Sequence, residues 1–178
     1  MKSIIIESAA FMLAGRSDYL LFLNKIELSE LKGLDYTELK TIIDRSISNM
    51  EQAAAYYKSL YKIAIITPYN KTIIRKLKTF DYDRFEKEKK PTPTIFKEVR
   101  RTLSSGNIDA LYYRMWSGTQ NIYKNLLSIK NSIEKETFPN LSNLWQINRD
   151  FADLSLFGQF AAEVFYSILQ PSINFANE

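Results

Sequence analysis

The amino-acid sequence predicts an all-α fold, an up-and-down bundle of about four long helices. Apolar residues recur at spacings of three and four over long segments, which is the pattern of amphipathic helices. No segment shows the alternation expected of a strand, and only five Gly and five Pro are available for turns in 178 residues. The length fits one domain covering residues 1–178.

The first two long helices are expected at about residues 3–32 and 36–66. Gly33 is suited to end the first helix, and Asp35 with Glu38 forms a capping box at the start of the second. The apolar stripe of the first helix comprises Ile5, Ala9, Met12, Tyr19, Leu23 and Ile26. The heptad seam of the second comprises Tyr36, Leu39, Ile43, Ser46, Met50, Ala53, Tyr57, Leu60 and Ala64.

A basic insertion at residues 68–106 separates the second long helix from the third. Thr-Pro pairs at 67–68 and 92–93 are typical helix starts, with Thr as the cap and Pro in the first turn. They predict two short helices, one ending near residue 79 and the other near residue 103. Residues 81–90 are charged and lack a clear apolar stripe, so no helix is expected there.

The last two long helices are expected at about residues 108–134 and 141–169, the second ending before Pro171. From residue 154 onward the final helix is apolar nearly all round, which indicates the most buried helix. The seam of the final helix comprises Leu141, Leu144, Asn148, Phe151, Ser155, Gly158, Ala162, Phe165 and Leu169. A second stripe beside it comprises Ile147, Leu154, Ala161 and Ile168.

Small residues fall near the midpoint of each long helix: Gly15, Ala53, Gly118 and Gly158. In an antiparallel bundle of matched helices these midpoints share one layer. We therefore expect a narrow waist, where close helix approach makes a larger side chain costly.

The sequence contains neither Cys nor His. Zinc–cysteine sites, iron–sulfur clusters, thiol catalysis, His-based catalysis and the Glu-x-x-His di-iron site are therefore excluded. Asp44, Glu51, Asp150 and Asp153 lie off the apolar seams, so no inward-facing set of carboxylates is expected to hold magnesium. We expect no metal, no cofactor and no enzymatic activity.

The insertion is the compositional outlier of the chain. It contains eleven cationic and five acidic residues, a net charge of +6 against +4 for the whole chain. Lys71, Arg75 and Lys78 fall on one face of the first short helix, and Arg100 and Arg101 end the second. These five residues are the candidate site for nucleic acid or another polyanion. The alternative, which the sequence favours, is a solvated connection whose last arginines stabilise a helix C-terminus.

The predicted function is non-enzymatic binding of a macromolecule by a helical bundle, as a regulatory or assembly component with a protein partner. One alternative is a nucleic-acid-binding accessory protein that uses residues 68–106. Another is a small-molecule-binding bundle with a pocket near the mid-helix residues Tyr56, Tyr57, Tyr112, Tyr113, Met115 and Trp116. No segment is apolar enough to span a membrane, and Glu7 interrupts the only segment that resembles a signal peptide. We expect a cytoplasmic protein, and the sequence leaves its oligomeric state open.

Overall fold

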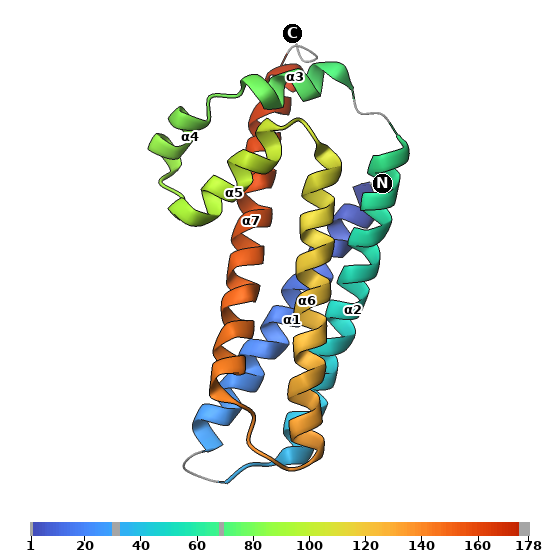
Figure 1. The fold of residues 1–178 in the computed structure, drawn as a ribbon, viewed down its shortest axis with the longest axis vertical. Coiled ribbons are helices and arrows are strands. Elements are labelled where there is room, and N and C mark those ends of the chain that lie inside the picture. The colour runs from blue at the N-terminus through green and yellow to red at the C-terminus, as the bar shows by residue number, and fades with distance from the viewer. Residues whose placement is uncertain (1, 30–32, 68–69, 175–178) are drawn as a thin grey trace.

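The computed structural model describes residues 2–29, 33–67 and 70–174, and within these ranges all regular structure is helical (Figure 1). The prediction of an all-α fold is therefore confirmed. No strand occurs in the described ranges. The seven helices described are α1 (Lys2–Ser29), α2 (Tyr36–Ile66), α3 (Lys71–Thr79), α4 (Tyr82–Lys89), α5 (Pro93–Ser104), α6 (Ile108–Glu134) and α7 (Leu141–Asn174).

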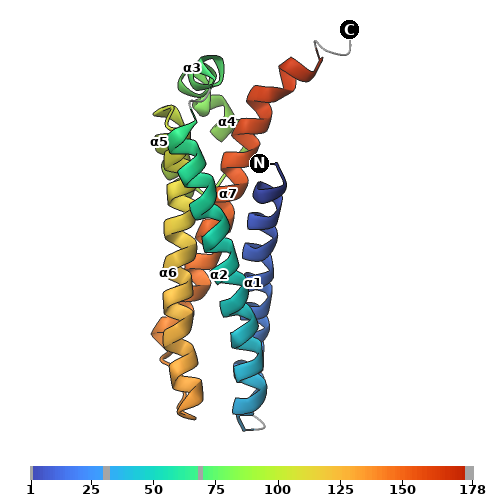
Figure 2. The ribbon, with the colours of Figure 1, turned by 90° about the vertical axis from the view of Figure 1, so that its right-hand side faces the viewer.

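The four long helices α1, α2, α6 and α7 run along the long axis of the molecule, and α3, α4 and α5 lie at one end (Figures 1 and 2). We call α3–α5 the cap segment. It lies where α2 ends and α6 begins. Figure 2 shows α7 leaning away from the other long helices towards its C-terminal end.

The cap segment contains three helices, so the expectation of two short helices is wrong. Residues 82–89 form α4 because the Asp81 side chain accepts a hydrogen bond from the Arg84 amide at 3.0 Å. Tyr82 and Phe85, one turn apart, then bury their rings and leave the charged residues outside. Lys90 ends the helix in the left-handed conformation, with φ 47°.

The start of α3 also differs from the expectation. Asn70 caps this helix by accepting a hydrogen bond from the Thr72 amide at 2.7 Å, and Lys71 is its first residue. Thr67 instead ends α2, because its amide donates to the Ile63 carbonyl at 2.9 Å. Pro68, the expected first residue of this helix, lies outside the described residues.

Two other predicted boundaries can be compared with the structure. The amide of Gly33 donates to the Ser29 carbonyl at 2.8 Å with φ +80°, as expected of a glycine after a helix, while residues 30–32 lie outside the described ranges. The helix expected to end before Pro171 continues to Asn174.

The core is rich in aromatic side chains between α1 and α7. Tyr19 and Phe22 of α1 and Phe151 of α7 are fully buried, and the Tyr19 and Phe151 rings lie 5.4 Å apart. The Tyr19 hydroxyl donates to the Leu144 carbonyl at 2.6 Å. The buried Ser46 hydroxyl of α2 donates to the Gly15 carbonyl of α1 at 2.8 Å. The buried hydroxyls of Tyr19 and Ser46 are thus both hydrogen-bonded to a carbonyl of another helix.

The expected seam of α7 is displaced around the helix by one position. Residues of the second stripe are buried, with Ile147 and Leu154 each 1% exposed, whereas Ala162 of the expected seam is exposed. The apolar composition of α7 does not bury it on every side, because Gln159 is exposed and Tyr166 is 64% exposed. Because α7 carries apolar residues on all sides, its sequence does not indicate which side packs against the other helices.

The mid-helix glycines lie at different levels. Gly15 faces Met50 of α2, whereas Gly118 faces Leu154 of α7. In the antiparallel pair of α2 and α6, Lys58 lies beside Trp116 and Asp44 lies beside Lys130. In the same register Met50 of α2 lies beside Lys124 of α6. Lys124 is six residues, or about 9 Å along the helix, from Gly118, so Gly15 and Gly118 lie at different heights in the molecule. The expected shared layer is therefore wrong, because the long helices differ in length and α1 starts lower than α2 ends (Figure 2).

Candidate functional site

The three predicted cationic residues of α3 are exposed to solvent. Lys71, Arg75 and Lys78 form no ion pair with any carboxylate that the structure describes. A Cβ atom built on Gly106 would lie 2.7 Å from Cε of Lys78, so the aliphatic part of this lysine covers the turn before α6. The charges of α3 are therefore free to meet an anion, while Lys78 also has a packing role.

The two predicted arginines of α5 differ from each other. Nη1 of Arg100 donates to Oδ1 of Asp83 at 2.6 Å, and its guanidinium lies 5.7 Å from the centre of the Tyr82 ring. This hydrogen bond raises the pKa of Arg100 above its ordinary value. Arg101 is exposed in the last turn of α5 and has no ion pair within the described ranges. Arg100 thus links α5 to α4, and Arg101 remains available to a ligand.

Contacts between its three helices hold the cap segment together. The Tyr82 hydroxyl of α4 donates to the Leu77 carbonyl of α3 at 2.7 Å, and burial raises the pKa of Tyr82 to about 12. Phe85 of α4 and Phe96 of α5 stack with ring centres 5.4 Å apart. The cationic surface of α3 therefore lies on a packed segment.

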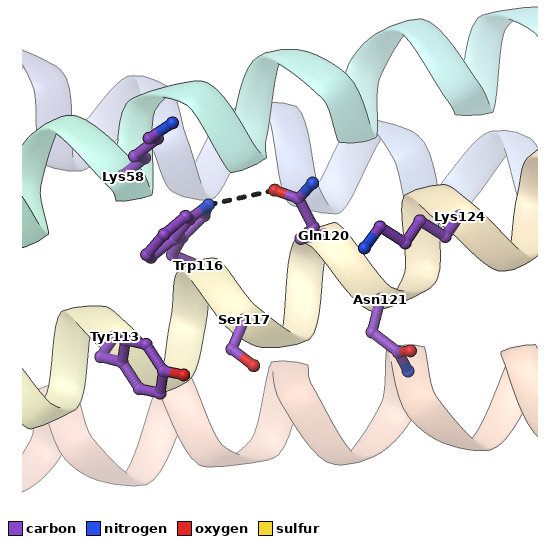
Figure 3. A pocket seen from close by; sticks show the side chains of 7 residues that line it. All are labelled: Lys58, Tyr113, Trp116, Ser117, Gln120, Asn121 and Lys124. Carbon is purple, nitrogen blue, oxygen red and sulfur yellow. Dashed lines mark hydrogen bonds between the residues drawn. The ribbon is translucent and has the colours of Figure 1, made fainter.

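A groove of about 440 Å³ lies between α2 and α6 (Figure 3). Because it follows the last turns of α2 and the first half of α6, it lies toward the end of the molecule that carries the cap segment (Figure 1). Most of its side chains are exposed, so it is an open surface feature and not an enclosed pocket. Its lining residues are Lys58, Tyr113, Trp116, Ser117, Gln120, Asn121 and Lys124.

Three aromatic rings meet at one end of this groove. Tyr61 of α2 lies 5.7 Å from Trp116 in a stacked arrangement and 5.4 Å from Tyr113, measured between ring centres. Trp116 Nε1 donates to Oε1 of Gln120 at 3.1 Å, which fixes the indole (Figure 3). The Tyr113 side chain is 52% exposed, so this ring is open to a ligand. Such a set of rings provides a rigid stacking surface.

The groove is electrostatically positive. Nζ of Lys58 lies 5.5 Å from the centre of the Trp116 ring, and Lys124 comes from the next turns of α6 (Figure 3). No Asp or Glu lines the groove, and neither lysine forms an ion pair with a described carboxylate. The arrangement is suited to a ligand that combines a negative group with a flat ring.

The sequence identified part of this groove. Tyr113 and Trp116 were candidates for a small-molecule pocket, but Lys58 and Lys124 were not. The spacing of α2 and α6 along the chain hides their proximity, since only the fold brings Lys58 to Trp116. A mixture of exposed Lys and aromatic residues on two predicted helices is the only sequence signal available.

Two of the carboxylates considered for a metal, Asp44 and Asp150, contact nearby polar groups. Lys130 Nζ lies 2.9 Å from Oδ1 of Asp44, and this contact raises the pKa of Lys130. Asp150 accepts a hydrogen bond from Gln146 at 2.8 Å. No group of three or more acidic residues in the part of the chain that the structure describes is arranged to hold a metal ion.

No helix among the described residues is long and apolar enough to cross a membrane. Comparison with known proteins gives no relative: no family model matches this chain, and no curated protein or solved structure matches it either.

Proposed function

We propose that this chain is a non-enzymatic binding protein that holds a single-stranded nucleic acid at the end carrying the cap segment. In this proposal the long helices form an up-and-down bundle, and α3–α5 are a basic insertion that caps it. The observation that carries the proposal is the groove between α2 and α6, where Tyr113 and Trp116 stand beside Lys58 and Lys124 without any lining carboxylate. No such combination of rings and free cations was considered from the sequence.

The chemistry of the groove favours a single strand over a duplex. Lys58 and Lys124 would neutralise phosphates, and the exposed ring of Tyr113 would stack on a base. A duplex hides the faces of its bases, whereas a single strand presents them. Gln120 and Asn121 add amide groups that pair with base edges.

The cap segment extends the same surface chemistry. Lys71, Arg75 and Lys78 lie on α3 at the end of the molecule where the groove lies, and none of them pairs with a described carboxylate. Each cation that meets a phosphate releases counterions, which makes affinity depend on salt. Five contacts, two in the groove and three on α3, give a slope of log affinity against log salt of about −3.5 for a single strand.

A tryptophan titration tests this proposal. The chain has two Trp residues, so a Trp145→Phe variant leaves Trp116 as the only reporter. An oligouridylate of about 12 nucleotides should quench its fluorescence at about 50 mM salt. Charge reversal at Lys71, Arg75 and Lys78 together should weaken binding and reduce the salt slope to about −1.4, because only the groove lysines remain.

A stacking variant distinguishes nucleic acid from other polyanions. Tyr113→Ala should weaken oligouridylate binding by about 1–3 kcal/mol, while heparin binding should change little. Tyr166→Ala is the matched control, because Tyr166 is 64% exposed on α7 outside the groove. Absence of quenching by both RNA and DNA single strands at low salt would refute the proposal. The predicted protein partner would then be the remaining function class.

A further inference from the structure

The first helix has two opposite apolar faces. Its inner face contributes Met12, Tyr19, Phe22 and Ile26 to the core. Its outer face exposes five large apolar side chains: Ile6 (60%), Leu13 (52%), Leu20 (43%), Leu21 (38%) and Leu28 (54%). Figure 2 shows α1 at an outer edge of the molecule, which agrees with the exposure of these five side chains. A helix that is apolar on both faces is normally buried on both.

The outer face is also free of charge. Between Ala10 and Asn24 every exposed position of α1 bears Ala, Leu, Ser or Asn. The charged residues of this stretch lie at the sides, where Asp18 meets Arg45 of α2 at 3.4 Å. The exposed side of a helix in a soluble monomer usually carries charged residues. A contiguous apolar, uncharged face of this length is typical of an interaction surface.

The spacing of the face favours a helical occupant. Ile6, Ala10, Leu13, Ser17, Leu20 and Asn24 follow one another at intervals of four and three, which is the repeat that packs one helix along another. A helix that lies on a membrane surface normally has Lys and Arg along its rim. The exposed charges that flank this face are Glu7 and Glu27, which an anionic lipid surface would repel. Arg16 and Lys25 at its edges are half-buried, and Lys25 is paired with Glu38 at 3.0 Å.

Three pairs of positions on the face lie symmetrically about Ser17, and Leu20 is matched by the smaller Ala14. Leu13 and Leu21 each lie four positions from it, Ala10 and Asn24 seven, and Ile6 and Leu28 eleven. We propose that α1 pairs with α1 of a second copy of this chain, antiparallel, around a two-fold axis at Ser17. Such an axis places Ile6 and Leu13 of one copy at the level of Leu28 and Leu21 of the other. The same patch on both subunits then forms the interface, as two-fold symmetry requires.

This pairing is independent of the nucleic-acid proposal, because α1 contributes nothing to the groove. The uncharged face brings no like charges together at the centre of the pair. From Ile6 to Leu28 the contact spans about 33 Å of helix. One helix pair is smaller than a standard protein interface, so the dimer should dissociate at micromolar concentrations.

Sedimentation of the full chain tests the existence of the dimer and its location. The 20.7 kDa chain should sediment as a dimer at about 100 μM and as a monomer well below 1 μM. Leu13→Glu with Leu20→Glu should abolish the dimer while the helical circular dichroism remains. Leu127→Glu is the matched control, since Leu127 is 39% exposed on α6, and it should leave the dimer intact. A monomeric wild type at 100 μM, or a dimer that survives the double substitution, overturns the proposal.

Disulfide trapping tests the antiparallel arrangement. The chain has no Cys, so each introduced thiol is unique. Under mild oxidation Ser17→Cys should form covalent dimers rapidly, and Ser128→Cys, an exposed position on α6, should not. In a mixture, Ala10→Cys should cross-link to Asn24→Cys in preference to itself. Preferential self-linking of Ala10→Cys would indicate a parallel pair and would overturn the two-fold axis at Ser17.

Discussion

Replacing Gly15 by Ala should destabilise the protein, although alanine is the better helix former. In a helix interior the change from Gly to Ala stabilises by about 1 kcal/mol. At Gly15, however, the new Cβ would lie 2.7 Å from Sδ and 2.9 Å from Cγ of Met50. Carbon atoms normally approach to about 3.5–4.0 Å. Met50 is fully buried, so it cannot yield without disturbing its neighbours.

The cost of this overlap outweighs the gain. Overpacking a core position costs about 1–3 kcal/mol, so the Gly15→Ala variant should lose up to about 2 kcal/mol of unfolding free energy. Gly158 provides the matched control, because its new Cβ would lie 3.4 Å from Cε of Met115, an ordinary contact. Gly158→Ala should therefore gain about 1 kcal/mol.

Urea denaturation followed by far-UV circular dichroism measures both variants. Protein concentration must be equal in all samples, because any self-association makes apparent stability depend on it. Gly15→Ala should lower the unfolding free energy and Gly158→Ala should raise it, so the two variants should differ from each other by about 1–3 kcal/mol. Equal stabilisation by both substitutions would refute the packing of Met50 against Gly15.

Three further predictions concern buried groups. Tyr19→Phe should lower the unfolding free energy by about 1–2 kcal/mol in urea denaturation, because the Leu144 carbonyl loses a buried hydrogen bond while ring packing is retained. Burial raises the pKa of Tyr19 and of Tyr57 above the ordinary 10.0, so unfolding releases protons in alkali. The unfolding free energy should therefore not change through these two groups below pH 10, and above pH 10 it should fall by about 1.4 kcal/mol per pH unit for each group. Tyr57→Phe should reduce this slope in an alkaline titration. Gly118→Leu should cost about 1–3 kcal/mol, because even a Cβ there would lie 2.7 Å from Cδ1 of Leu154; a variant as stable as wild type would show open space at this position.

The sequence predicted long helices well and short ones poorly. The start of α2 was predictable because a capping side chain acts locally: Asp35 accepts from the Glu38 amide at 3.1 Å. The helix α4 was missed because its apolar stripe consists of Tyr82 and Phe85 alone. Two residues cannot establish a periodicity against a charged background, and the packing that stabilises them comes from α3 and α5.

The candidate site was predictable only in part. The exposed face of α3 follows from helical geometry, since Lys71, Arg75 and Lys78 lie opposite the buried Leu77. The involvement of Arg100 with Asp83 was not predictable, because the two residues are seventeen positions apart and meet through the turn between α4 and α5. Contacts between separate helices depend on how the helices are arranged, and no local pattern encodes that arrangement.

The hydrogen bond from Tyr19 to the Leu144 carbonyl has a consequence for the order of folding during synthesis. It joins residues 125 positions apart, so the core face of α1 obtains this partner only after α7 begins to emerge from the ribosome. At about 5–20 residues per second, α1 waits roughly 6–25 s for it. Among the described residues α1 packs mainly on α2 and α7, so during that interval α2 is its main available neighbour. We therefore expect the α1–α2 hairpin to form first and the docking of α7 to complete the fold.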